Sequence, residues 1–277
     1  MSIIKAACIQ LNNGPDIAEN IAVTSEMIRE AAGQGAQFIA TPENTCHMVW
    51  PFTKRLSAAR PQENHETLAA LQALAAELNI WLSIGSLGIA VDKRTLANRS
   101  FLISDQGQIV ASYDKIHLFD VDLPNGERYR ESAIIRPGEK AVLADAAGAK
   151  LGLSICYDVR FATLYRTLAK AGAQILTVPA AFSVPTGQAH WETLLRARAI
   201  ETGSFVLAPA QTGTHEGGRA TWGHSLIIGP WGDILGAAGK EPGIISADLD
   251  LDEVEKARTS IPALQHDREF TLEHVKD

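Results

Sequence analysis

The most informative stretch of the chain is KLGLSICYDVRFATLYR, which runs from Lys150 to Arg166. Its first part, residues 150–155, alternates leucine and isoleucine with small residues and predicts a short buried strand, whereas residues 161–171 repeat apolar side chains at helical spacing. Cys156 stands between the two elements, where its sulfur can point into a cleft and the following backbone N–H groups can hold an anion. This placement suits a nucleophile, although most free cysteines are simply buried in a core.

Outward from this stretch, predicted strands and helices alternate along the chain. The strands are expected at residues 3–11, 36–41, 80–90, 174–182, 204–211 and 244–249, and the helices at 16–32, 66–78, 190–201 and 251–257. Hairpins are expected around residues 105–107 and 229–232. Because hairpins pair antiparallel strands, two mixed sheets packed back to back with helices outside fit this pattern better than one parallel sheet.

Three segments are less regular. Residues 44–63 are expected to form a loop over a site, residues 215–223 a glycine-rich loop, and the polar tail after Pro262 an arm. No change of composition marks a linker, so we predict a single domain over residues 1–277.

Composition excludes several classes of partner. The 277 residues include 25 Lys and Arg against 32 Asp and Glu, a net charge of −7, and no dense basic run, so nucleic acid is not an expected partner. No apolar run is long enough for a bilayer, and the N-terminus lacks the layout of a signal peptide, so no membrane is expected. The three widely spaced cysteines are typical of a reducing cytoplasm without disulfides.

A catalytic cysteine needs a base or a charge partner, because the pKa of free cysteine is near ~8.5. Glu43 follows the predicted strand 36–41, where an apolar cleft would raise its pKa and suit it to act as a base; a turn carboxylate is an equally good interpretation. Lys115 ends a hairpin strand, and its apolar neighbours favour partial burial over the usual surface position. Glu131 lies in a polar loop, where the residues alone favour a solvated side chain.

Histidines offer a rival arrangement. Cys156 paired with His190 or His224 would resemble a thiol protease or acyltransferase, although these two and His117 have apolar surroundings typical of structural histidines. No cysteine or histidine pair has metal-ligand spacing, and neither a P-loop nor a dinucleotide fingerprint occurs. We therefore expect no metal and no cofactor.

Three of these stretches together resemble the nitrilase superfamily of carbon–nitrogen hydrolases. They are Pro42-Glu43, Lys115 in YDKIHLF and Cys156 in SICYDVRF, and the likeness extends over nearly the whole chain. The resemblance implies an α/β fold, a four-layer αββα sandwich with two mixed β-sheets, and a catalytic Glu43, Lys115 and Cys156. It also implies a homodimer or higher homo-oligomer. Glu131 matches an additional glutamate found in many members.

Within the superfamily the chain is most similar to the deaminated glutathione amidases and the neighbouring ω-amidases. The likeness lies in CYDVRF, in GQAHWETLLRARAIET from Gly187 to Thr202, and in residues 211–215 with Arg219. The last group favours a deaminated glutathione amidase. Residues 44–52 and the tail after Gln265 depart from the pattern, which leaves the substrate-facing loop and the subunit contact open.

The implied reaction transfers an acyl group to water through a thioester. Glu43 takes the thiol proton, Cys156 attacks a terminal amide carbonyl, and Lys115 with the backbone N–H of Tyr157 holds the oxyanion. Ammonia leaves with the proton from Glu43, which then activates water.

The other expected contributions are less specific. Glu131 would orient Lys115 or the small-molecule amide substrate, and Arg160 and Arg219 are candidates for substrate carboxylates. For Arg160, a salt bridge to Asp158 is the alternative. Other activities left open are an ω-amidase on 2-oxoglutaramate, another amidase or carbamoylase of the superfamily, an acyltransferase, and a non-catalytic scaffold.

Overall fold

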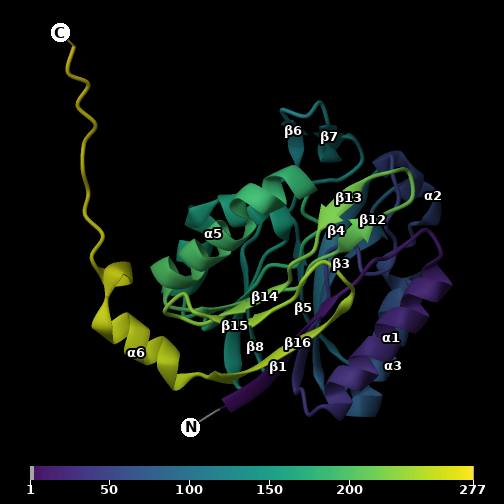
Figure 1. The fold of residues 1–277 in the computed structure, drawn as a ribbon, viewed down its shortest axis with the longest axis horizontal. Helices are drawn as coiled ribbons and strands as arrows, with labels where there is room; N and C mark the ends of the chain where they lie inside the picture. Colours follow the sequence, from purple (N-terminus) through teal and green to yellow (C-terminus); the bar gives the residue numbers. More distant parts are fainter. Residues whose placement is uncertain (1–2, 277) are drawn as a thin grey trace.

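The computed structural model describes residues 3–276 and has two β-sheets packed face to face, with helices on their outer faces (Figure 1). Helices α1 (Ile17–Gly33) and α3 (Glu66–Leu78) cover one sheet, while α4 (Ala162–Lys170) and α5 (Val184–Thr202) cover the other. This is the αββα sandwich that the resemblance implied, and its sheets are mixed as expected.

The two sheets repeat one pattern of strand pairing. The first has the order β16 (Gly243–Asp250), β1 (Ile3–Gln10), β2 (Phe38–Ala40), β3 (Trp81–Ala90), β4 (Leu96–Ile103), β5 (Ile109–Asp114). The second has the order β15 (Ile234–Ala237), β14 (Leu226–Ile228), β11 (Phe205–Ala208), β10 (Ile175–Thr177), β9 (Ala149–Leu153), β8 (Val142–Ala146). In each sheet three central strands are parallel, and the strands flanking them are antiparallel.

Local signals explain most of the helix boundaries. The Asp16 side chain accepts a hydrogen bond from the backbone N–H of Glu19 at 3.0 Å, which caps α1 as predicted. Helix α3 has the predicted bounds. Helix α5 begins at Val184 rather than at residue 190, because a proline is tolerated in the first turn of a helix. The last helix, α6, spans Asp252–Ser260.

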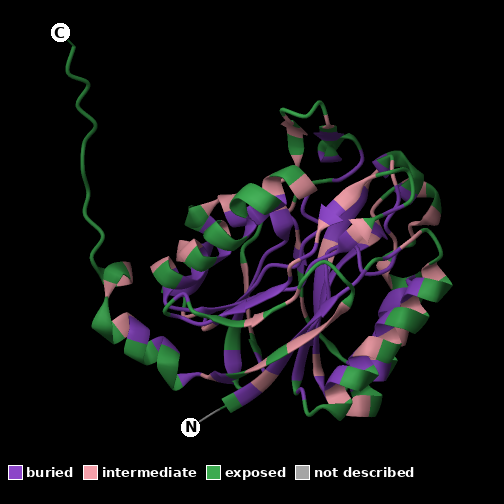
Figure 2. Ribbon diagram, viewed as in Figure 1, coloured by how far each residue is buried: buried purple, intermediate pink, exposed green. Residues whose placement is uncertain are grey.

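Apolar side chains of both sheets meet in a shared inner core, which Figure 2 shows as buried strands between outwardly exposed helices. The first sheet contributes residues such as Cys8 and Phe38, and the second contributes residues such as Leu151 and Ile175. Burial raises the pKa of the Cys8 thiol well above its usual range, so Cys8 is an inert core residue.

Three segments differ from the sequence prediction. The glycine-rich stretch is not only a loop, because β12 (Thr212–Thr214) and β13 (Ala220–Trp222) pair across it as a hairpin. Residues 44–63 contain short helical segments: η1 (Phe52–Lys54), α2 (Arg55–Ala58) and η2 (Gln62–Asn64). The hairpin of β8 and β9 was missed, because its turn places Ala147 at φ +51°, where glycine or asparagine is the usual signal.

The remaining elements are short. They are β6 (Asp120–Asp122), β7 (Arg128–Arg130), η3 (Glu131–Ala133), η4 (Cys156–Arg160) and η5 (Ala263–Gln265). After η5 the chain extends away from the sandwich as the expected arm (Figure 1). Among residues 3–276, no helix has both the length and the apolar character needed to cross a membrane.

Candidate active site

The predicted catalytic side chains meet at one edge of the sandwich, where the three strands that precede them end. Glu43 follows β2, Lys115 follows β5, and Cys156 begins η4 just after β9. Carboxyl ends of parallel strands in open α/β sheets are a common position for ligand sites. Here they border a pocket of about 380 Å³, its open mouth included. Its lining residues are Glu43, Asn44, Phe52, Arg55, Lys115, Phe119, Glu131, Cys156, Tyr157, Ala181, Phe182, Ser183, Thr186 and Arg219.

The two sheets approach each other closely beside this pocket. A Cβ atom at Gly85 would lie 2.0 Å from the carbonyl oxygen of Thr41 and 2.5 Å from the Cβ of Pro179. The backbone N–H of Ala181 donates to Oε2 of Glu43 at 2.9 Å, which joins the chain after β10 to the chain after β2. Only glycine fits at position 85, so this residue permits the contact that brings Glu43 to the second sheet.

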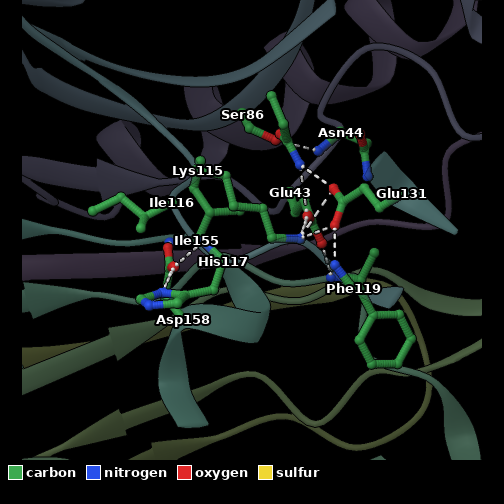
Figure 3. A network of polar contacts seen from close by, with 12 residues as sticks. Glu43, Asn44, Ser86, Lys115, Ile116, His117, Phe119, Glu131, Ile155 and Asp158 are labelled. Carbon is green, nitrogen blue, oxygen red and sulfur yellow. Dashed lines mark hydrogen bonds and ion pairs between the residues drawn. The ribbon is translucent and has the colours of Figure 1, made fainter. Parts of the chain in front are cut away.

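A buried ion network occupies the base of the site (Figure 3). The Nζ of Lys115 lies 2.9 Å from Oε1 of Glu43 and 2.9 Å from Oε2 of Glu131. Asn98 donates from its side-chain amide to Oε1 of both glutamates, at 2.9 and 3.1 Å. The backbone N–H of Phe119 donates to Oε2 of Glu131 at 2.7 Å. Lys115 is therefore buried, as its apolar neighbours favoured, whereas the prediction of a solvated Glu131 is wrong because that side chain is buried and paired.

The network sets the resting protonation states. Burial alone would raise the pKa of Glu43, but the nearby charge of Lys115, with smaller contributions from Arg219 and Asn98, outweighs it and lowers the pKa to about 2. The predicted rise for Glu43 is therefore wrong. Burial alone would lower the pKa of Lys115, but Glu131 and Glu43 raise it above its usual range. The resting site therefore holds an ionised carboxylate and an ammonium group.

Cys156 is held in an unusual backbone conformation. Its φ is +49°, which L-residues other than glycine rarely adopt, and its N–H donates to the carbonyl of Pro179 at 2.9 Å. Burial raises the pKa of its thiol, and the negative charge of Glu43 raises it further. The resting cysteine is a neutral thiol beside a carboxylate. Tyr157 lies in the first turn of η4, where backbone N–H groups have no acceptor within the helix.

Asp158 connects the cysteine turn to the segment that carries Lys115 (Figure 3). It accepts hydrogen bonds from the backbone N–H of Ile155 at 2.8 Å and from the hydroxyl of Tyr113 at 2.7 Å. The ring Nδ1 of His117 lies 2.7 Å from the same carboxylate. Asp158 thus fixes the position of Cys156 relative to Lys115 without lining the pocket itself.

The rival Cys–His arrangement does not form in the described residues. No histidine lines the pocket: the Nδ1 of His190 lies 3.3 Å from Nη2 of Arg160, and the ring of His224 stacks on Trp222. Residues 3–276 contain no cluster of three or more His, Cys, Asp or Glu side chains that could hold a metal ion.

The two arginines predicted to bind carboxylates have different positions. Arg219 lines the pocket, and its Nη2 donates to the carbonyl of Ala181 at 2.7 Å. Arg160 does not line the pocket; its guanidinium lies 5.8 Å from the ring centroid of Tyr157, at the rim. Arg160 and Asp158 form no ion pair among the described residues. The Asp158 carboxylate instead contacts Tyr113, His117 and the backbone N–H of Ile155.

His215 stabilises the hairpin that carries Arg219. Its backbone N–H donates to the carbonyl of Arg219 at 2.8 Å, and its ring nitrogens lie 2.8 Å from the Asn13 carbonyl and 2.7 Å from the Thr221 hydroxyl. Burial, together with the charge of Arg219, lowers the pKa of His215 to about 4. The hairpin that carries Arg219 is therefore built around a neutral imidazole.

This lowered pKa predicts a loss of stability in acid. Below pH ~6.5 the unfolded chain protonates His215 and the folded chain does not, so the free energy of unfolding falls as the pH drops from ~6.5 to about 4. We expect His215 to lower the free energy of unfolding by about 2–3 kcal/mol at pH ~4.5 relative to pH ~7. Urea unfolding of the wild type and of His215→Gln, each at pH 7 and 4.5, measures how much of the pH dependence of stability comes from His215. The same pH dependence in both proteins would contradict the assignment.

Sequence reasoning missed Arg55, Phe52 and Asn98. Arg55 lies on α2 and Phe52 on η1, in the segment predicted to be irregular, and both line the pocket. Asn98 lies within β4, where nothing in its neighbourhood distinguishes it from any other strand residue. The only available signal for the first two was that residues 44–63 follow Glu43 directly.

Comparisons with known proteins agree with this geometry. The family model for carbon-nitrogen hydrolases matches residues 5–259. The chain is 42% identical over 266 residues to a deaminated glutathione amidase of Synechocystis, covering 94% of this chain and 97% of that protein. The human deaminated glutathione amidase is 38% identical over 268 residues, covering 95% of this chain and 81% of that protein.

Two solved structures extend the comparison. The NitFhit protein of C. elegans superposes with a TM-score of 0.89 at 34% identity, covering 97% of this chain and 66% of that chain. A variant of the Nesterenkonia amidase, from the nitrilase superfamily, superposes with a TM-score of 0.77 at 28% identity, covering 96% and 94%. That structure shows the acetamide moiety of fluoroacetamide added covalently at its active-site cysteine. The chain described here belongs to the carbon–nitrogen hydrolase family, whose members hydrolyse carbon–nitrogen bonds other than peptide bonds.

Proposed function

We propose that this protein is an amidase that cleaves the ω-amide bond of a small carboxylic substrate through a thioester on Cys156. The observation that carries the proposal is the buried contact of Lys115 with Glu43 and Glu131, at 2.9 Å each, in the pocket that Cys156 also lines. Base, cation and thiol are thereby available to one bound amide.

The proton movements follow from the resting states. Because Glu43 is ionised and the pKa of Cys156 is raised, the thiol loses its proton to Glu43 as the sulfur attacks the amide carbonyl, not before. Glu43 next gives this proton to the leaving amine, and the C–N bond breaks to leave the thioester. Glu43 then takes a proton from water, which attacks the thioester and releases the acid and the thiol.

Lys115 is assigned to the oxyanion. The raised pKa of its ammonium keeps it charged throughout the reaction, and with the backbone N–H of Tyr157 it would hold the negative oxygen formed in each half-reaction. Glu131 is assigned the orientation of Lys115, because both of its carboxylate oxygens accept from Nζ, at 3.1 and 2.9 Å. The Phe119 N–H holds Glu131 in turn.

The proposed substrate is deaminated glutathione, as in the named relatives. Its competitor is the smaller 2-oxoglutaramate, the substrate of an ω-amidase. We expect a higher kcat/KM for deaminated glutathione, measured as release of the shared 2-oxo acid. A clear preference for 2-oxoglutaramate would make the protein an ω-amidase. Activity only on nitriles or N-carbamoyl compounds would contradict the proposed substrate, although the assignment to the family would stand.

We also propose a homodimer or a higher homo-oligomer. Helix α5 is the candidate contact surface, because its exposed Ile200 lies in one surface hollow with exposed Trp231 and Ile261. An apolar group of this kind is typical of protein contacts. Light scattering at micromolar concentration should give at least twice the 29.8 kDa of the chain. A monomer would contradict the proposal.

Two broader expectations are retained as proposals. The core shared by the two sheets supports a single carbon–nitrogen hydrolase domain over residues 1–277. All three cysteines are free and buried, which supports a site of action in a reducing compartment such as the cytoplasm.

A further inference from the structure

The pocket contains two arginines without a carboxylate partner, of which Arg55 is buried and Arg219 is half-buried. Arg55 is only 6% exposed, and both Arg55 and Arg219 line the pocket. Neither occurs in any ion pair among residues 3–276. In the same described part of the chain, the Nε of each is buried without a hydrogen-bond partner. Buried cations without an anionic partner are costly, so this pair needs an explanation.

Each guanidinium is held by neutral contacts close to the catalytic base, and Arg55 also donates from Nη2 to the sulfur of Met48 at 3.7 Å. Arg55 donates from Nη1 to Oδ1 of Asn44 at 2.8 Å, and Asn44 is the residue after Glu43. Arg219 donates to the carbonyl of Ala181, whose N–H in turn donates to Glu43. These contacts orient both arginines but bring no negative charge into hydrogen-bond contact with either guanidinium; Glu43 and Glu131 act on Arg55 only from a greater distance than an ion pair.

A shared aromatic ring brings the two cations together. The guanidinium carbons of Arg55 and Arg219 lie 4.8 and 5.3 Å from the ring centroid of Phe52. Burial, and after it the charge of Arg219, lowers the pKa of Arg55 to about 10. The charged lining residues are Lys115, Arg55 and Arg219 against Glu43 and Glu131, so the pocket lining carries an excess of one positive charge. One carboxylate would balance it.

We propose that Arg55 and Arg219 form a two-arginine site for a carboxylate on the acyl half of the substrate. The acyl half stays on Cys156 through both half-reactions and can therefore occupy buried groups, whereas the leaving amine must pass to solvent. A carboxylate accepts paired N–H bonds from the fork of a guanidinium, and the free Nε of each arginine supplies one of them. Arg55, on α2, thereby becomes a specificity-determining residue. This inference rests on the proposed amidase function.

The test compares two amides of the same length that differ only in the end group. Glutaramate carries a carboxylate where pentanamide carries a methyl group. For the wild type we expect a kcat/KM for glutaramate roughly 10²-fold above that for pentanamide. Arg55→Met should lower the value for glutaramate roughly 10²-fold and leave that for pentanamide within a few-fold. Arg55→Lys should recover part of the loss, because it keeps the charge without the fork.

The matched control is Arg94→Met, which makes the same change at an exposed arginine in the turn before β4. It should leave both values unchanged. If Arg55→Met lowers both substrates alike, Arg55 only supports the site, and the carboxylate site is overturned while the amidase function stands. Equal wild-type kcat/KM values for glutaramate and pentanamide would likewise overturn the carboxylate site and leave the amidase function standing. If the wild type cleaves deaminated glutathione but neither shorter amide, the carboxylate site is overturned while the amidase function stands; cleavage of none of the three would overturn the amidase function, and the carboxylate site with it.

Discussion

Cys156→Ala is expected to lower kcat by roughly 10⁶-fold, the scale seen when a covalent nucleophile is removed from a hydrolase. The physical reason is that no other described thiol can replace it, since Cys8 lies in the core between the sheets and Cys46 in the core under α1 and α3. Product release under saturating glutaramate measures the loss. The fold should persist, because alanine fills most of the cysteine volume and the N–H bond to Pro179 is unchanged.

Cys46→Ala is the matched control. It removes a second buried thiol, whose pKa is raised to about 11 chiefly by burial, from a position outside the catalytic pocket. We expect near-native turnover from this variant. Retained turnover in Cys156→Ala would mean that the acyl group is never carried by this sulfur.

Lys115→Gln is expected to have the second-largest effect, on activity and stability together. Turnover should fall at least ~10²-fold, because one oxyanion donor is lost. The free energy of unfolding should fall by about 3–5 kcal/mol, because the carboxylates of Glu43 and Glu131 then lie buried without their cation. Urea unfolding and kcat/KM, measured on the same preparation, give both numbers.

The double variant Lys115→Gln/Glu131→Gln separates the two effects. Removing the charge of Glu131 as well returns the net charge of the buried network to its wild-type value. Stability should therefore recover substantially, while turnover stays low. Glu43→Gln leaves the Lys115–Glu131 pair intact, so it should stay folded. It should lose more activity than Lys115→Gln, because Glu43 transfers protons in both half-reactions. Near-native turnover in Lys115→Gln would make Lys115 a structural residue.

The sequence predicted the elements that carry the site, because β2 and β9 have apolar patterns typical of buried strands and β5 belongs to a hairpin with a clear turn signal; a chemically reactive residue follows each of the three. Glu43, Lys115 and Cys156 each stand at such a position. That they converge was known only from the family resemblance. The contact depends on the close approach of the two sheets at Gly85, and a glycine inside a strand indicates an approach without naming the partner.

The electrostatics could not be predicted in the same way. Whether burial raises the pKa of Glu43 or Lys115 lowers it depends on a contact between residues 72 positions apart. Arg55 was missed for a similar reason, since an arginine in an irregular segment is usually exposed, and this one is buried by contacts with Asn44, Met48 and Phe52. Local patterns report burial along an element; they do not report which charges meet.

A partitioning experiment tests the central claim, that the acyl group is carried on the enzyme between two half-reactions. Glutaramate and N-methylglutaramate have different leaving groups and would form the same thioester on Cys156. In the presence of a fixed concentration of hydroxylamine, the ratio of hydroxamate to glutarate formed from each substrate is measured. We predict the same ratio for both, because water and hydroxylamine compete for one common intermediate. A ratio that changes with the leaving group would contradict the thioester mechanism.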